Sequence, residues 1–307
     1  MPQTLPNPLV QAGAANRVRA GSADRAFDAP VLLGLWHLTS IDAPTVAVVW
    51  SLGFAWAAGV RLPVWIPVLL ALAAWTVYIV DRLLDANTAL RSSDLSGLRE
   101  RHRFHYRHRR ALIPVAIAAA CAAICIVFTF MPWAARERDS ILGLAAVAYF
   151  ARVHAPRTPA GGLPCLSRLL RKEMLVGLLF TAACALPAIS RAAPHISSVP
   201  WPVFGTAALF TLLAWLNCHA IDRWEVGEHE KGKLMILVPA CLLAFAGLML
   251  AAILSSTQTR PAALVVAGAV SALLLALLDG LRGRFTPLAL RTYADLVLLA
   301  PLVLILR

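Results

Sequence analysis

The chain has 307 residues, a net charge of +12, and a composition that is 60% hydrophobic and only 14% charged. Its mean hydropathy is +0.72, whereas ordinary soluble domains are nearer half apolar and a quarter charged. This composition excludes a soluble globular protein, and no separate basic domain is present that could bind nucleic acid. Long apolar runs predict an integral, multi-pass, all-α membrane protein.

Residues 1–30 are rich in Ala, Pro and Arg and contain no long apolar core. They therefore predict a disordered cytoplasmic tail rather than a signal peptide. Residues 31–307 form the predicted membrane domain, with nine spans, of which the fourth is short. The spans are expected near residues 40–60, 63–80, 111–131, 140–153, 173–190, 201–218, 234–255, 261–280 and 289–306.

The positions of Lys and Arg predict how these spans are oriented. With nine spans, the loops on the side of the N terminus carry 22 of the 28 basic residues, and the other side carries 6. Because basic loops stay in the cytoplasm, we place the N terminus there, as in a bacterial inner-membrane protein. The net charge then reflects topology and attraction to anionic lipids.

The first acidic cluster follows the second predicted span, in the sequence WTVYIVDRLLDANTALR. Asp81 and Asp85 are four residues apart, so they share one face of a helix. Two carboxylates this close repel each other unless a cation lies between them. Carboxylate oxygens are ligands that Mg²⁺ prefers, so we expect a magnesium site here. A solvated helix end is the alternative.

A second acidic cluster, residues 222–228, follows the sixth predicted span. Asp222 and Glu225 are three residues apart and share a helix face, with Glu228 beyond them. Asn217 lies earlier in the same apolar run, where a buried amide needs hydrogen-bond partners. Both clusters are expected on the cytoplasmic side, and both begin with Asp-Arg after hydrophobic residues. They predict one shared cation site between two halves of a duplicated bundle.

Paired carboxylates with basic side chains nearby are typical of a site that binds a diphosphate through Mg²⁺. Lys and Arg hold the phosphate charge that the cation leaves unpaired. In a membrane protein, such a site favours an isoprenoid diphosphate as substrate. The basic residues expected to bind the diphosphate are Arg82, Lys172, Arg223 and Lys231.

Residues 86–110 are predicted to form a cytoplasmic cap loop, which contains the sequence RERHRFHYRHRR at 99–110. We expect this basic segment to touch anionic headgroups or the substrate diphosphate. His102, His105 and His108 recur every three residues, and a zinc site is the alternative. The six Arg residues around them oppose a bound cation.

The layout of these motifs resembles the UbiA superfamily of intramembrane prenyltransferases, as a divergent member. That family has nine helices and two cytoplasmic aspartate-rich motifs, roughly NDxxDxxxD and DxxxD. Asp81 and Asp85 match the last two aspartates of the first motif. Asp222 matches the start of the second, with Glu225 and Glu228 as its acidic followers.

Two further segments carry the resemblance, which covers roughly residues 35–307. Arg171-Lys172 resembles a basic pair before the family's fifth span, and TYADLVLLAP, with Asp295, resembles the final helix of some members. The resemblance implies two pseudo-repeated helical bundles with a cytoplasmic cap. It also implies a Mg²⁺-dependent transferase that moves an isoprenoid group from a prenyl diphosphate to a lipophilic acceptor within the membrane.

The roles implied by the resemblance fall on three sets of residues. The catalytic set is Asp81, Asp85, Asp222 and Glu225, and the metal ligands are these four with Glu228. The residues expected to line the cavity for the acceptor are Tyr78, Tyr149, Asn217 and Asp295, and Trp75 and Trp215 are further candidates for an aromatic wall.

The sequence also departs from the family pattern. Val77-Tyr78 stands where the family has Asn-Asp, and Glu replaces Asp in the second motif. A catalytically inactive membrane subunit with the same fold is therefore one alternative. A transporter is the other, although transporters place their ionisable groups near the membrane midplane, and the predicted spans carry almost no charge there.

Overall fold

The computed structural model describes residues 27–91, 100–154, 172–192, 201–226 and 233–306. The described residues are almost entirely helical, and none of them forms a β-strand. The first half contains α2 (Val31–Leu38), α3 (Asp42–Ala57), α4 (Trp65–Arg91), α5 (Glu100–Phe130) and α6 (Trp133–His154). The second half contains α8 (Lys172–Ala192), α9 (Trp201–Val226), α10 (Lys233–Ser255), α11 (Thr259–Leu281), the short 3₁₀ turn Arg282–Arg284, α12 (Pro287–Val297) and α13 (Leu302–Ile305).

The described helices are those of an integral, multi-pass membrane protein. Seven helical segments are long and apolar enough to cross a membrane, and the bent pair α2–α3 brings the number to eight if it forms one span. Large apolar side chains also cover outward faces, as on α10, where Leu242 and Phe245 are each 62% exposed. Contiguous apolar surface of this kind suits contact with lipid and marks a membrane-facing side.

Two of the nine predicted spans differ from expectation. The span predicted near 40–60 is one arm of a broken helix, because α2 and α3 meet at an angle of 87°. Ser40, between them, has a left-handed backbone with φ of 57°. The fourth predicted span falls in α6, which is not among the candidate spans, since residues 136–139 (RERD) place four charges in its first turns. Nine spans are thus not confirmed.

The predicted cap loop is shorter than expected, because α4 continues to Arg91 and α5 already begins at Glu100. Arg and Glu have high helix propensity, which explains why the basic residues from Glu100 onward form the start of α5 rather than a loop. His105 is fully buried, and its Nε2 lies 3.3 Å from the Ser40 hydroxyl. The basic segment therefore packs through His105 against the bend between α2 and α3.

Most of the predicted N-terminal tail, residues 1–26, lies outside the described residues. The first described residue, Phe27, pairs with the segment that precedes α12. Its N–H donates to the carbonyl of Arg284 at 2.7 Å, and its carbonyl accepts from the N–H of Thr286 at 2.9 Å. The start of the described chain is thus held beside the start of α12.

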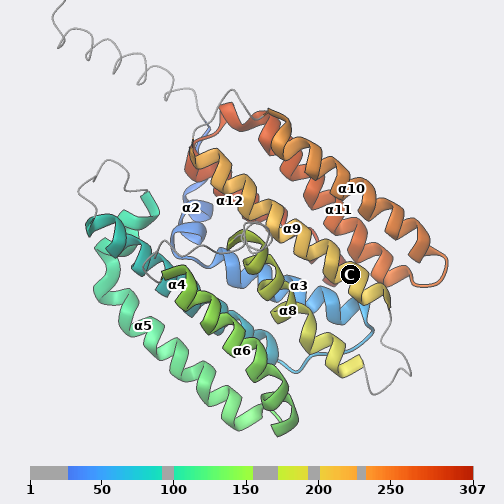
Figure 1. Ribbon diagram of the computed structural model, residues 1–307, viewed down its shortest axis with the longest axis horizontal. Helices are drawn as coiled ribbons and strands as arrows, with labels where there is room; N and C mark the ends of the chain where they lie inside the picture. Colours follow the sequence, from blue (N-terminus) through green and yellow to red (C-terminus); the bar gives the residue numbers. More distant parts are fainter. Residues whose placement is uncertain (1–26, 92–99, 155–171, 193–200, 227–232, 307) are drawn as a thin grey trace, which may run out of the picture.

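The helices are arranged around a central group. In Figure 1, α4, α5 and α6 lie on one side of the molecule and α10 and α11 on the other, with α3, α8 and α9 between them. Neighbours in the chain pack as pairs, namely α4 with α5, α8 with α9, and α10 with α11. Helix α3 packs against both α4 and α8, so it connects the two sides.

An aromatic cluster fixes α3 against α9 and the C-terminal segment. The rings of Trp50 and Phe210 stack with their centroids 3.8 Å apart, and Phe54 packs edge-on against Phe210. Trp50 Nε1 also donates a 2.9 Å hydrogen bond to the carbonyl of Leu298, just after α12. These contacts position α3, α9 and α12, which all contribute to the site described below.

Helices α8 and α9 approach each other closely at Gly177. A methyl group at this position would lie 2.9 Å from the carbonyl oxygen of Thr211 and 3.1 Å from the amide nitrogen of Trp215. Only glycine allows this separation without a backbone shift. The close approach also brings Glu173, one turn earlier on α8, to the cavity that α9 lines.

Candidate functional site

A cavity of about 260 Å³ lies between helices α2, α3, α4, α5, α8, α9 and α12. Six carboxylates, two arginines and one histidine line it, so its wall carries more negative than positive charge. Such a site favours cationic ligands, or anions that arrive with a metal ion. Its polar lining residues are His37, Asp42, Tyr78, Asp81, Arg82, Asp85, Arg101, Glu173, Asn217, Cys218, Asp222 and Asp295.

Helix α4 contributes the first acidic cluster. Asp81 and Asp85 both line the cavity, as their spacing of four residues on one helix predicts. Arg82 and Tyr78 line it as well, and the Arg82 guanidinium lies 6.0 Å from the centre of the Tyr78 ring. This distance is at the outer limit of a cation–π contact. The arginine is therefore placed among the carboxylates rather than in the lipid.

Helix α9 contributes Asp222, from the second acidic cluster, and polar residues that precede it in the chain. Asn217, Cys218, Ile221 and Asp222 line the cavity, and their spacing corresponds to one face of a helix. Asp222 is exposed, whereas Asn217 is only 5% exposed. The cavity thus extends from the protein surface at Asp222 into the buried interior at Asn217.

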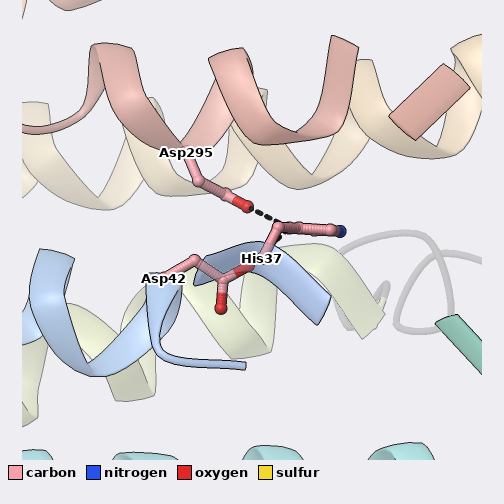
Figure 2. Close-up of side chains that lie close together, drawn as sticks. All are labelled: His37, Asp42 and Asp295. Atoms are coloured by element: carbon pink, nitrogen blue, oxygen red, sulfur yellow. Dashed lines mark ion pairs between the residues drawn. The ribbon is translucent and has the colours of Figure 1, made fainter. Parts of the chain in front are cut away.

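The buried end of the cavity contains a cluster of His37, Asp42 and Asp295 (Figure 2). The three side chains come from the end of α2, the start of α3 and the last turn of α12. His37 Nδ1 lies 2.6 Å from Asp42 Oδ2 and 3.4 Å from Asp295 Oδ2. Asn217 Nδ2 donates a 3.0 Å hydrogen bond to Asp295 Oδ1, so the cluster is continuous with α9.

The cavity brings together much of the predicted site. Seven predicted residues line it, and they come from α4, α9 and α12. These residues are Asp81, Asp85, Arg82, Tyr78, Asn217, Asp222 and Asp295. The two predicted acidic motifs, far apart in the chain, therefore face the same cavity.

Other predicted residues have different positions. Arg223 and Tyr149 are not among the described residues that line the cavity, although Tyr149 lies close enough to Asp81 to interact with it electrostatically. Lys172 begins α8 and Glu225 lies in the last turn of α9, but the side chains of both fall outside the described residues. Glu228 and Lys231 lie outside the described residues altogether.

The aromatic residues predicted for the cavity wall are only partly placed there. Trp75 Nε1 donates a 2.9 Å hydrogen bond to the carbonyl of Thr39, and so anchors α4 to the end of α2. Trp215 stacks on His219 of the same helix, with ring centroids 5.4 Å apart. Neither Trp is among the described residues that line the cavity, whereas Phe180 of α8 does line it.

Three charged cavity residues, His37, Asp42 and Glu173, were not predicted as part of the site, whereas Arg101 belongs to the segment expected to touch headgroups or the diphosphate. Asp42 could have been predicted from the sequence, because placing an acidic residue at the start of a long apolar run costs free energy and such residues usually have a function. Glu173 directly follows the basic pair at 171–172, and Arg101 lies within the basic segment. His37 could be related to Asp42 only through the bend between α2 and α3.

Carboxylates from five helices thus converge with two arginines and one histidine on one cavity, which has an exposed acidic end and a buried end. Its lining also includes the apolar side chains of Val46, Phe180 and Leu298. Comparisons of the chain with protein-family models, with curated proteins and with solved structures give no match.

Proposed function

We propose that the protein is a Mg²⁺-dependent prenyltransferase, which moves an isoprenoid group from a prenyl diphosphate to a lipophilic acceptor within the membrane. The observation that carries this proposal is the convergence of Asp81 and Asp85 from α4 with Asp222 from α9 on one cavity. This arrangement best supports the proposal that the chain is a divergent member of the UbiA superfamily.

The chemistry of four cavity carboxylates supports a magnesium ion, and the ion would have to draw them together, because among the described residues no three of Asp81, Asp85, Asp222 and Glu173 place ligand atoms within 4.8 Å of one another. Asp81, Asp85 and Asp222 are hard oxygen donors, and Glu173 adds a fourth carboxylate to the same cavity. When bound, Mg²⁺ would neutralise charge on the diphosphate leaving group. Glu225 and Glu228, which follow Asp222 in the sequence, belong to the same proposal.

The remaining groups divide between the two parts of a prenyl diphosphate. Arg82 and Arg101 line the cavity with the acids, where guanidinium groups bind phosphate oxygens and hold the leaving group. Val46, Phe180 and Leu298 provide apolar surface for the isoprenoid chain and exclude water from the reacting carbon. Lys172, Arg223 and Lys231 are further candidates for the phosphate, and Tyr78 and Tyr149 for the acceptor side.

A transfer assay with labelled prenyl diphosphate tests the proposal. Membranes that contain the protein, incubated with a lipid extract as the source of acceptor, should form a labelled lipid only when Mg²⁺ is present. Asp81→Asn and Asp222→Asn should abolish this product, because each removes a carboxylate from the cation site. Asp139→Asn is the matched control, since Asp139 lies on α6 and is hydrogen-bonded to Arg138 away from the cavity.

The assay separates loss of chemistry from loss of the protein when equal amounts of folded protein are compared. Wild-type activity in both Asp81→Asn and Asp222→Asn would remove the basis of the assignment. Transfer that persists after chelation of divalent cations would contradict the role given to Mg²⁺. Binding of the prenyl diphosphate without any transfer would favour the catalytically inactive subunit instead.

A transporter is the second candidate, and one observation favours it. The α2–α3 pair is a broken helix whose bend faces buried ionisable side chains, an arrangement that transporters use for substrate sites. Reconstitution into liposomes distinguishes the two candidates. A transporter would move its substrate across a sealed membrane unchanged, whereas the transferase would convert the prenyl diphosphate without needing a sealed compartment.

The finer topology belongs to the same proposal. Nine spans would require α2–α3 to count as one span and α6 to be another, and the 22 residues of α6 are about 33 Å long at 1.5 Å per residue. We propose the cytoplasm of a bacterial inner membrane for the N terminus and for the acidic end of the cavity, on the basis of the basic loops. Two pseudo-repeated bundles would place α4 and α9 in equivalent positions.

A further inference from the structure

We propose that His37, Asp42 and Asp295 form a second metal site, which binds a divalent transition metal ion such as Zn²⁺ at the buried end of the cavity. One ligand atom from each side chain lies within 4.8 Å of the other two. The site differs from the proposed magnesium site in position and in chemistry, because it includes an imidazole nitrogen. The existence of this second site does not depend on the prenyl-transfer proposal.

The two carboxylates of the cluster are oriented in the same way. Asp42 Oδ1 accepts a 2.8 Å hydrogen bond from the N–H of Ala43, and Asp295 Oδ1 accepts one of 3.0 Å from Asn217 Nδ2. Each carboxylate therefore has one oxygen fixed by an amide N–H, and its Oδ2 faces His37 Nδ1. Outer hydrogen bonds of this kind orient the ligands of metal sites.

His37 Nδ1 lies close to both carboxylates but lacks hydrogen-bond geometry to either of them. Among the described residues, it has no hydrogen-bond partner at all. Ligands at 2.0–2.1 Å from a tetrahedral Zn²⁺ are about 3.3 Å apart, and the Nδ1–Asp295 separation is 3.4 Å. The Nδ1–Asp42 separation is 2.6 Å, so a bound ion would move these two groups apart by several tenths of an ångström.

Burial makes the charge of the cluster costly without a cation. His37 is 5% exposed and Asp42 is 3% exposed, and the side chain of Asp295 is 17% exposed. Two carboxylates so close together in the interior repel each other unless a proton or cation compensates them. The positive charges that act on Asp42 are those of protonated His37 and, from α4, of Arg82. A dication bound to neutral His37 would balance both carboxylates.

A separate observation comes from Asn217, which is 5% exposed and lines the same cavity. Its Nδ2 is used by Asp295, but its Oδ1 is buried and has no hydrogen-bond partner among the described residues. A buried amide oxygen without a partner is unfavourable. A metal ion, or a water molecule bound to it, would satisfy this oxygen and complete a set of one nitrogen and three oxygen donors.

This donor set selects the class of metal. Imidazole together with carboxylates binds Zn²⁺ and other first-row divalent ions, whereas Mg²⁺ and Ca²⁺ prefer oxygen ligands alone. The cavity beside the cluster leaves space for a further ligand, as in metal sites that bind water or substrate. Asp81, Asp85 and Asp222 lack a nitrogen donor, so the two sites should differ in metal preference.

Metal binding by the purified full-length protein tests the site. The protein in detergent would be stripped with a chelator and then titrated with Zn²⁺ in excess Mg²⁺, which occupies oxygen-only sites. Bound zinc would be counted by mass spectrometry after gel filtration, and the visible absorption of Co²⁺ would report nitrogen coordination. We expect one Zn²⁺ per chain and at least about tenfold weaker binding in His37→Gln and Asp295→Asn.

Two control variants locate the ion. Asp81→Asn and Asp139→Asn should bind Zn²⁺ as the wild type does, because neither changes the cluster. Zn²⁺ should also raise the melting temperature of the wild type and leave that of His37→Gln unchanged, since only a ligand that binds the folded state stabilises it. A normal melting temperature of His37→Gln without metal shows that the variant is folded.

Three outcomes would overturn the site. The first would be a wild type that binds no Zn²⁺ above background. The second would be His37→Gln and Asp295→Asn variants that bind Zn²⁺ as tightly as the wild type. The third would be loss of Zn²⁺ binding in Asp81→Asn while His37→Gln retains it. None of these measurements uses a prenyl diphosphate, so failure of the metal site and failure of the transfer reaction are recorded separately. If His37→Gln does not fold, Asp295→Asn and the wild-type titration still decide the result.

Discussion

Asn217 of α9 donates a 3.0 Å hydrogen bond to Oδ1 of Asp295 on α12. The two helices pack against each other, and this bond joins them where they line the cavity. Because Asn217 is almost completely buried, water cannot easily replace it as a donor. The contact thus links the helix of the second acidic motif to the C-terminal part of the fold.

Asn217→Ala should reduce stability. The substitution leaves the partly buried Asp295 carboxylate without its amide donor, which costs about 1–3 kcal/mol in the free energy of unfolding. Thermal unfolding of the protein in detergent, followed by circular dichroism, measures the change. Asn87→Ala is the matched control, because Asn87 is exposed near the end of α4. Equal melting temperatures for the two variants would contradict the role of this bond.

Gly177→Ala should destabilise the protein through overpacking. The added methyl group would meet the backbone of α9 at 2.9 Å, and the shift that relieves such a contact costs about 1–3 kcal/mol. Gly143→Ala on α6 is the control, since nothing lies within 4 Å of its added methyl group. In that variant the higher helix propensity of Ala should leave stability unchanged or raise it. The melting temperature of Gly177→Ala should therefore be below that of the wild type, and that of Gly143→Ala should be equal to it or above it.

Arg82→Gln should weaken the use of prenyl diphosphate if the proposed transfer is correct. A hydrogen bond from a charged guanidinium contributes about 1.5–3 kcal/mol, so kcat/KM should fall about 10- to 150-fold. Steady-state kinetics with varied prenyl diphosphate measures this change. Arg61→Gln, at an exposed position outside the cavity lining, should keep the wild-type kcat/KM. An equal loss in both variants would argue against a phosphate contact at Arg82.

Leu242→Arg should impair insertion of α10. Leu242 is 62% exposed and lies within the candidate span Met235–Ser255, so its side chain faces lipid. A charge near the middle of a span costs about 2.5–3.5 kcal/mol on insertion scales. The yield of protein in the membrane fraction should fall, whereas Leu242→Met should leave it unchanged. Normal membrane yield of Leu242→Arg would show that this face of α10 does not contact lipid.

Much of the cavity lining could be predicted from the sequence, because the spacing of acidic residues within one helix determines which of them share a face. Asp81 and Asp85 lie four residues apart on a helix, and such residues share a face wherever the helix packs. Asp222 could be related to them through the repeated Asp-Arg pattern and the alternation of basic loops. Membrane helices were predictable for the same reason, since length and hydropathy are properties of each segment alone.

The buried end of the cavity could not be predicted in this way. The relation of His37 to Asp42 depends on the 87° bend between α2 and α3, and the length and hydropathy of a segment do not reveal such a bend. Its relation to Asp295 depends on the packing of α12 against α2 and α3. The basic segment at 99–110 was misjudged as loop, because its charge suggested solvent while its helix propensity and the buried His105 determined the result.

The position of Asp295 on α12 also affects how the protein is made. His37 and Asp42 are synthesised together at the start of the membrane domain, and the bend can bring them together early. Asp295 follows every other long helix that the structure describes. Until α12 inserts, the carboxylate of Asp42 therefore lies near the membrane without its last partner. Docking of α12 closes the buried end of the cavity, which makes assembly of the site one of the final steps of biogenesis.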